Sequence, residues 1–159
     1  MLKKTNIAVI FEDSRFGGPH QQFINILKYS KHDFKILISI YESNFFKKKI
    51  KEINKNFQTQ KIIPLSINFN YLLSYFLFFF VDIYKINRFI HKSRCDYVYI
   101  PGGVSCIKTL FACILMKKKF IWHVHDCHSN FIFILIFKIF KKYSKKIIFA
   151  SLKSYDYYS

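Results

Sequence analysis

The chain has few of the residues that interrupt secondary structure. Only four of its 159 residues are glycine and three are proline, against 20 phenylalanines and 11 tyrosines. With 52% hydrophobic residues, the chain is too apolar to remain disordered. Its length suits a single domain with a core of its own. We therefore expect one folded unit, residues 1–159, built from long helices and strands with few loops.

Acidic residues and arginine are also scarce. Nine Asp and Glu stand against 26 Lys and Arg, which gives a net charge of +17, and only three of the basic residues are arginine. Because arginine makes the bidentate contacts to phosphates and base edges, its shortage argues against specific nucleic-acid recognition. Two explanations of the lysine excess remain, a compositionally biased genome and attraction to anionic lipid headgroups.

Paired cysteines and a signal peptide are both missing. The four cysteines show no Cys-x-x-Cys spacing, and Lys3 and Lys4 precede only five consecutive apolar residues. These features favour a reducing, cytoplasmic location.

No hydrophobic run reaches the roughly 18 to 20 residues that span a bilayer. The apolar runs at residues 71–81 and 131–137 both fall far short. The second continues into Lys138, Lys141, Lys142, Lys145 and Lys146, a pattern that suits an anionic membrane surface, on the inner face if the protein is cytoplasmic. The alternative is a helix that packs on a sheet while its lysines face solvent.

Apolar runs of strand length alternate with segments of helical periodicity along the whole chain. Strands are expected at residues 7–11, 34–40, 61–67, 96–100, 120–124 and 146–150, and helices at about 19–30, 42–56, 71–92, 105–116 and 131–143. Another helix is expected to begin after the last strand, and Pro64 shifts the third strand toward an edge position. This alternation predicts an α/β fold, a Rossmann-like doubly wound parallel sheet flanked by helices.

Glycine pairs follow two of the expected strands. They are Gly17 and Gly18, just before Pro19 and His20, and Gly102 and Gly103 after the fourth strand. A glycine turn that leads into a helix allows a ligand to approach the backbone amides closely, at the edge where α/β sheets bind ligands. The alternative is that glycine serves only the turn. The dinucleotide-binding fingerprint has a third glycine and an acid after the second strand, and this chain has neither at those positions. No nicotinamide or flavin cofactor is therefore expected.

Half of the six histidines lie at residues 123–128, after the fifth strand. A metal site is not expected, because His128 is followed by no further histidine or cysteine and only one acid, Asp156. His123 and His125 are two residues apart and point to the same side of an extended segment, with Asp126 at the turn. A cleft-facing imidazole oriented by a carboxylate can contact a sugar hydroxyl or a leaving phosphate. The alternative is that these polar residues only cap the next helix.

These motifs, in this order, resemble the N-terminal domain of family 4 glycosyltransferases, which have the GT-B fold. The resemblance covers nearly the whole chain. It rests on the Gly17–Gly18 turn, the long apolar helix leading to residues 96–99, the Gly102–Gly103 turn, and His125 with Asp126.

The resemblance implies transfer of a sugar from a nucleotide-sugar to an acceptor, often a lipid-linked saccharide or a cell-surface polysaccharide precursor. Gly17 and Gly18 would lie near the donor diphosphate and the acceptor. His125 and Asp126 are the expected catalytic pair, in which His125 would contact the sugar with Asp126 beside it. His20, Gly102, Gly103 and His123 complete the expected substrate-binding set. No cofactor is implied beyond the nucleotide-sugar donor.

The family places its donor site, with a pair of glutamates, in a second domain, and this chain has no glutamate after Glu52. The resemblance therefore implies an acceptor-side domain that does not transfer sugar by itself. The alternatives are a truncated product, one subunit of a split transferase whose partner supplies the donor half, and an inactive remnant. The rival hypothesis is a non-catalytic scaffold that binds a membrane surface or a partner through its lysine-rich helices.

Overall fold

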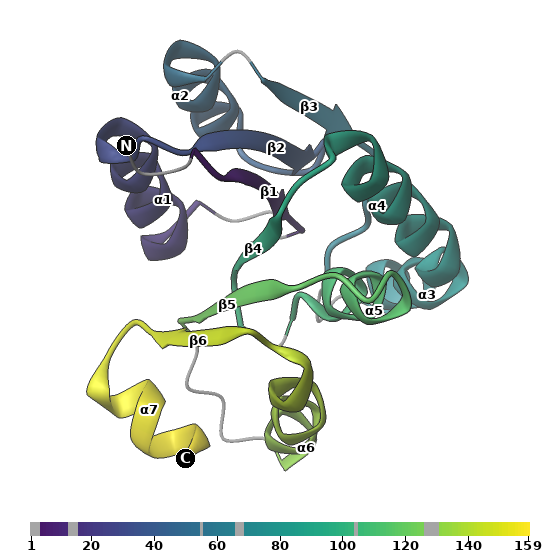
Figure 1. The fold of residues 1–159 in the computed structure, drawn as a ribbon. Helices are drawn as coiled ribbons and strands as arrows, with labels where there is room; N and C mark the ends of the chain where they lie inside the picture. Colours follow the sequence, from purple (N-terminus) through teal and green to yellow (C-terminus); the bar gives the residue numbers. More distant parts are fainter. Residues whose placement is uncertain (1–3, 13–15, 55, 66–68, 104, 126–130) are drawn as a thin grey trace.

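A six-stranded sheet, parallel throughout, forms the centre of the computed structural model (Figure 1). The structure describes residues 4–12, 16–54, 56–65, 69–103, 105–125 and 131–159. The strands are β1 (Asn6–Phe11), β2 (Asp33–Ser39), β3 (Phe57–Gln60), β4 (Tyr97–Pro101), β5 (Phe120–Val124) and β6 (Lys146–Phe149). Their order in the sheet is β3-β2-β1-β4-β5-β6. The predicted Rossmann-like doubly wound fold is confirmed.

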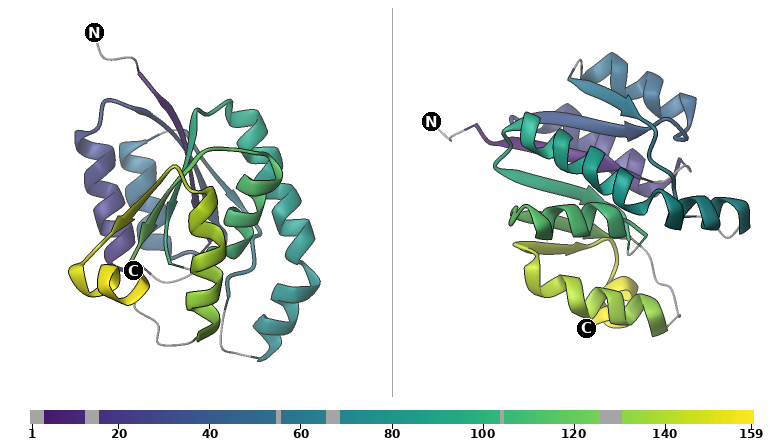
Figure 2. Two further views of the ribbon diagram at one scale, coloured as in Figure 1. Left: turned by 60° about the horizontal axis from the view of Figure 1, so that its bottom comes forward. Right: turned by 90° about the vertical axis from the view of Figure 1, so that its right-hand side faces the viewer.

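Helices cover both faces of the sheet. They are α1 (Gly18–Tyr29), α2 (Asn44–Ile53), α3 (Phe69–Leu77), α4 (Phe79–Ser93), α5 (Ile107–Leu115), α6 (Phe131–Phe140) and α7 (Leu152–Tyr158), and a 3₁₀ turn at Lys141–Tyr143 extends α6. In Figures 1 and 2, α1 and α2 lie on one side of the sheet and α3 to α6 on the other. The last helix, α7, follows the carboxyl end of β6, and its Tyr158 packs against Phe137 of α6. The expected helix after the last strand is α7.

The central strands are buried on both faces, which explains their unbroken apolar sequences. In β1, Ala8 and Ile10 face the core under α4 and α5, whereas Val9 and Phe11 face the core under α1 and α2. All four side chains are at most 2% exposed. Continuous apolar runs are typical of parallel strands covered by helices on both sides.

The third strand was predicted at residues 61–67, but the structure forms β3 at Phe57–Gln60. Ile62 and Ile63 are buried, yet side chains hold their backbone in place of strand pairing. The Ser39 hydroxyl at the end of β2 donates to the Ile62 carbonyl. The backbone N–H of Ile63 donates to Asp82, and its carbonyl accepts from Lys108. The apolar pattern therefore reflected burial beneath α4 and α5 and not sheet pairing. The third strand does lie at the sheet edge, but Pro64, on which that expectation was based, lies outside it.

The helix predicted at residues 71–92 is two helices, α3 and α4, divided at Phe78. No glycine or proline marks this point in the sequence, so periodicity gave no sign of the break. The right-hand view of Figure 2 shows α4 lying along the sheet while α3 projects past its edge. The helix predicted at residues 42–56 is shorter, because the Ser43 hydroxyl caps α2 by accepting from the Phe46 N–H.

Candidate functional site

The carboxyl ends of β1, β4 and β5 lie side by side at the middle of one sheet edge. Connections leave β1 and β4 in opposite directions across the sheet, which makes the space between them the topological switch point, where α/β folds bind ligands. Gly17 and Gly18 follow β1, Gly102 and Gly103 follow β4, and His125 follows β5. The fold thus brings the predicted glycines and His125 to a single edge, called the rim below.

A small cavity of about 30 Å³ lies at the switch point. It is lined by side chains and backbone from the ends of β1 and β4 and the starts of α1 and α5: Phe11, Glu12, Pro19, His20, Pro101, Gly102, Gly103, Ser105 and Cys106. Three of the predicted site residues therefore share one cavity, and an acidic residue at the end of β1 joins them.

Glu12 is the most perturbed acid at the rim. Its side chain is 3% exposed, and one carboxylate oxygen, Oε1, accepts hydrogen bonds from the backbone N–H and the hydroxyl of Thr109 in the first turn of α5. The other oxygen, Oε2, has no hydrogen-bond partner among the described residues. Burial raises the pKa of Glu12 to about 7, against the lowering effects of the Thr109 hydrogen bonds and the Lys108 charge.

Lys108 and Asp82 form a fully buried ion pair beside Thr109. The Lys108 ammonium donates to Asp82 at 2.7 Å and to the Ile63 carbonyl at 2.7 Å, and it lies 3.9 Å from the ring centre of Tyr75. Burial lowers the pKa of Lys108, while Asp82 and Glu12 act against that shift. The first turn of α5 is thus fixed on one side to β1 and on the other to α4.

His20 is buried and connects the start of α1 to the end of β2. Its Nδ1 accepts from the N–H of Gly17 at 3.2 Å, which assigns the ring proton to Nε2. Nε2 then donates to Oε2 of Glu42 at 2.8 Å, and Oε1 of Glu42 accepts from the Ser43 N–H. This geometry holds the backbone of the predicted phosphate-facing turn in a fixed position.

His123 and His125 lie on the same side of the chain, as predicted, with their ring centres 4.0 Å apart. His123 is buried and shares a hydrogen bond with the Tyr99 hydroxyl. Burial lowers the pKa of both rings; for His125 the pKa falls to about 4, assisted by the charges of His123 and His20. Nε2 of His125 is buried and has no hydrogen-bond partner among the described residues. At neutral pH this ring is uncharged.

None of the described glycines has a left-handed backbone conformation. Gly17 is extended, with φ near −160°, and no described glycine has a positive φ. A Cβ at Gly17 would approach Pro19 no closer than 3.8 Å, and one at Gly18 would contact nothing within 4 Å. Neither the backbone conformation nor the neighbouring atoms therefore require glycine at Gly17 and Gly18, and residues 13–15, between β1 and this pair, lie outside the described residues. At Gly102, by contrast, a Cβ would lie 2.5 Å from the Cys106 sulfur, so glycine is needed for packing.

Asp126, which was predicted to orient His125, lies outside the described residues. Three other groups at the rim were not predicted as site residues. Glu12 and Glu42 follow strands, the same signal that identified the glycines, but neither was among the expected site residues. Lys108 carried no signal, because a lysine in a helix is ordinarily exposed.

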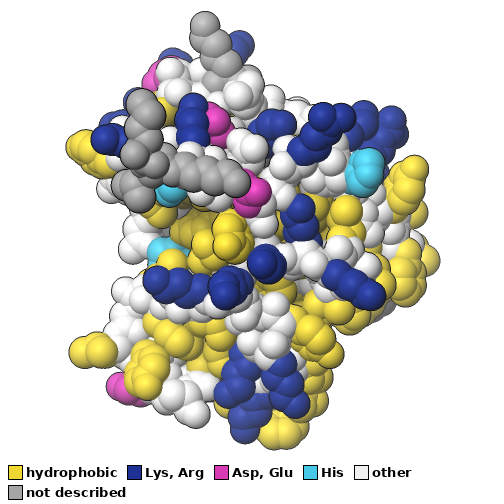
Figure 3. Space-filling view, viewed as in Figure 1, with side chains coloured by type: hydrophobic (Ala, Val, Ile, Leu, Met, Phe, Trp, Pro, Cys, Tyr) yellow, Lys and Arg dark blue, Asp and Glu magenta, His cyan; other side chains and the backbone are white. Residues whose placement is uncertain are grey.

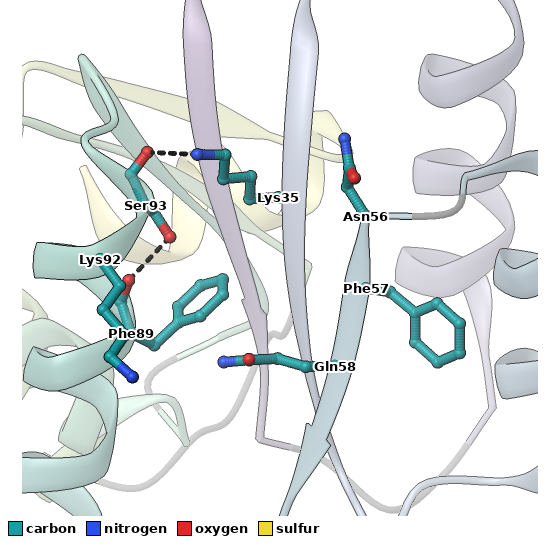
Figure 4. A pocket seen from close by; sticks show the side chains of 7 residues that line it. All are labelled: Lys35, Asn56, Phe57, Gln58, Phe89, Lys92 and Ser93. Carbon is teal, nitrogen blue, oxygen red and sulfur yellow. Dashed lines mark hydrogen bonds between the residues drawn. The ribbon is translucent and has the colours of Figure 1, made fainter.

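A groove larger than the rim cavity lies elsewhere in the described structure. It measures about 280 Å³ and is lined by the first residues of β2 and β3 and the last turn of α4, at the opposite edge of the sheet (Figure 4). Lys35 donates from its ammonium to the Ser93 carbonyl there at 2.9 Å, and Lys92 is the other charged residue of the lining. With no acid or histidine among these residues, the groove has none of the groups predicted for the site.

Known structures share this fold across nearly the whole chain. The Anabaena protein Alr3699/HepE, solved in complex with UDP and glucose, superposes with a TM-score of 0.72 at 14% identity and covers 97% of this chain. A Listeria monocytogenes protein described as a UDP-N-acetylglucosamine 2-epimerase gives 0.68 at 11% identity over 99% of it. The lipopolysaccharide outer core galactosyltransferase WaaB gives 0.62 at 17% identity over 94%.

The chain spans 40% of the length of HepE and WaaB and 42% of the length of the Listeria protein. No family model matches the sequence, and no curated protein matches it. The similarity therefore defines the fold, which is a Rossmann-like half of the GT-B architecture, like the N-terminal half of such proteins.

Proposed function

We propose that this chain is the acceptor-side half of a glycosyltransferase that moves a sugar from a nucleotide-sugar to a lipid-linked or cell-surface polysaccharide acceptor. The observation that carries the proposal is the rim itself: glycine backbone, a buried acid and an uncharged histidine gather at the switch point of a GT-B half-domain. HepE, which has the same fold over this region, was solved with UDP and glucose and with UDP-glucose. This supports nucleotide-sugar as the donor class.

Each rim residue has a proposed role. The uncharged His125 contacts a hydroxyl of the transferred or accepting sugar, and Asp126 orients its ring. The His123 ring packs against His125, and the Tyr99 hydroxyl hydrogen-bonds His123 and so fixes its position. Gly17 and Gly18 leave the surface before α1 open to a diphosphate, because neither glycine is required by its own conformation or by its neighbours. Gly102 and Gly103 line the same edge.

The donor-binding groups are proposed to come from a second Rossmann-like domain, whether on a partner protein or in a longer polypeptide. Without such a half, this chain would bind substrates at the rim but would not transfer sugar. A family 4 glycosyltransferase is the finer assignment that we propose within the GT-B class.

The proposal is tested by purifying the native protein with whatever binds it and assaying sugar transfer from UDP-glucose and related donors. With a donor half present, we expect transfer, and we expect His125→Ala to reduce it by 100-fold or more, as general acid-base groups typically contribute 10² to 10⁴. His32→Ala is the matched control, because His32 lies after α1 at the other edge of the sheet. Transfer that is unchanged in His125→Ala would show the site assignment to be wrong.

A second candidate function is supported by the surface of α4, α5 and α6, which lie side by side (Figure 2). Their outward faces carry large apolar residues: Phe80 is 79% exposed, Leu115 65% and Ile132 60%. Lysines follow on α6 and after α5, and Figure 3 shows hydrophobic side chains gathered over this side with basic clusters beside them. We propose that this face rests on an anionic membrane, either to bring a lipid-linked acceptor to the rim or as a non-catalytic scaffold. No described helix is long and apolar enough to cross a bilayer.

A further inference from the structure

Glu12, one of the residues that line the cavity at the switch point, has a carboxylate oxygen whose hydrogen-bonding capacity is unused by the described residues. Oε1 of Glu12 is saturated by two bonds from Thr109, whereas Oε2 is buried and is reached by no donor of the described residues. A buried polar atom without a partner is costly, and such atoms are rare in native proteins unless water or a ligand completes them. The 3%-exposed Glu12 side chain lines the cavity directly.

We propose that this cavity is a subsite for one hydroxyl or hydroxymethyl group of a saccharide, which donates its hydrogen bond to Oε2 of Glu12. The inference rests on the proposed function and adds to it the group that recognises the sugar and the atom that receives it. His125 would contact the same ligand from the end of β5, the strand next to β4 in the sheet.

The size and chemistry of the cavity select this class of ligand. About 30 Å³ holds one or two water-sized groups, which excludes a sugar ring, a guanidinium or a phosphate. A carboxylate also repels phosphate. Apart from Glu12 and His20, the lining is mainly apolar side chains and backbone, so a ligand group gains one strong bond and packs the rest of its surface. A hydroxyl bonded to a carboxylate is charge-assisted, and such bonds are about twice as strong as neutral ones.

The pKa of Glu12, raised to about 7 by burial, also agrees with a missing hydrogen-bond donor at this carboxylate. The carboxylate has less stabilisation from its surroundings than a solvated one, so a donated hydrogen bond to it is worth more than it would be in water.

Glu12→Gln is the discriminating variant. The Thr109 donors require an oxygen at the Oε1 position, so the new amide nitrogen takes the place of Oε2 and reverses the hydrogen-bond polarity there with little change of volume. The probes are the methyl glycosides of glucose, galactose and N-acetylglucosamine, each with its monodeoxy derivatives, and binding is measured by NMR titration and calorimetry. Glu52→Gln, a half-exposed acid on α2, is the matched control.

We expect at least one glycoside to bind the unmodified protein and one of its monodeoxy derivatives to bind about 10-fold more weakly, the size of one charge-assisted hydrogen bond. In Glu12→Gln the parent glycoside should lose the same factor, and the penalty for the deoxy derivative should disappear, whereas Glu52→Gln keeps both. If Glu12→Gln does not fold, the ¹³C resonance of the Glu12 carboxyl in the unmodified protein replaces it. Its pKa should fall on saturation with the parent glycoside and not with the deoxy derivative.

The subsite is overturned if every deoxy derivative binds like its parent, if the penalty is the same in Glu12→Gln, or if none of the three glycosides binds. It is also overturned if methylammonium, and not a glycoside, shifts the Glu12 resonance. Failure of the proposed function gives a different result, because sugar transfer is then absent from the complex with a donor half while the binding experiments proceed without that half.

Discussion

At the residue scale, the rim holds two groups with shifted pKa values, one raised and one lowered. Glu12 is an acid with a pKa raised by burial to about 7, and His125 is a base with a pKa lowered to about 4. Both shifts favour the uncharged form. A site with an uncharged imidazole and an acid that titrates near neutrality is suited to hydrogen bonds with hydroxyl groups.

These shifts predict opposite pH dependences of stability. Glu12 binds its proton more tightly when folded, so its contribution is complete below pH 4.5 and is lost as the pH rises to about 7, a difference on the order of 3 kcal/mol. His125 releases its proton on folding, so its contribution is complete above pH 6.5 and is lost as the pH falls toward 4.

The measurement is the free energy of unfolding in urea as a function of pH. Relative to the unmodified protein, Glu12→Gln should gain stability as the pH rises from 4.5 to 7, whereas His125→Asn should gain it as the pH falls from 6.5 to 4. Curves for either variant that run parallel to that of the unmodified protein would contradict the assignment for that residue.

At the scale of elements, the first turn of α5 is the junction of the molecule. Thr109 connects it to the end of β1 through Glu12, and Lys108 connects it to Asp82 in α4 and to the segment after β3. Asp82 in turn accepts from the Ile63 N–H. One buried ion pair thus fixes the backbone at Ile63, in the segment whose apolar pattern predicted a strand.

Lys108→Met should therefore destabilise the protein by about 3 to 5 kcal/mol, because it leaves the Asp82 carboxylate buried without its main partner. Lys85→Met is the control, since Lys85 contacts the same carboxylate from a partly exposed position, and it should cost no more than about 1 kcal/mol. The double variant Lys108→Met with Asp82→Asn should recover part of the loss. Urea unfolding that gives equal costs for Lys108→Met and Lys85→Met would rule out this role of the buried pair.

At the scale of the whole molecule, the sheet separates two different surfaces. The rim and α3 lie toward the carboxyl edge, and the apolar, lysine-bordered face of α4 to α6 lies on one side of the sheet (Figures 2 and 3). A protein resting on this face would hold its rim close to the membrane surface, where a lipid-linked acceptor has its saccharide.

Vesicle co-sedimentation tests this arrangement. We expect binding to vesicles that contain anionic lipid, weakening as salt is raised, because the Debye length falls from about 10 Å at 0.1 M to about 3 Å at 1 M. Ile132→Ser combined with Phe80→Ser should weaken binding severalfold. Tyr29→Ser, which changes an equally exposed side chain on the opposite helical layer, should not. Absent or salt-insensitive binding would count against a membrane role.

The sequence by itself determined the α/β class, the parallel doubly wound sheet and the place of the rim. Each of these depends on local patterns: apolar runs in strands covered on both faces, helical periodicity between them, and polar residues where strands end. For the same reason it located His123 and His125 on one side of the chain.

Only the tertiary structure decided where β3 pairs, where the long helix divides, and which acid is buried at the rim. An apolar pattern records burial but not the group that a backbone amide bonds, so a segment held by Asp82 and Lys108 looks the same as a strand. The pKa of Glu12 depends on Thr109, 97 positions away, and on enclosure by four elements that meet only when the sheet forms. Such properties arise from neighbours in space, and the order of residues along the chain does not contain them.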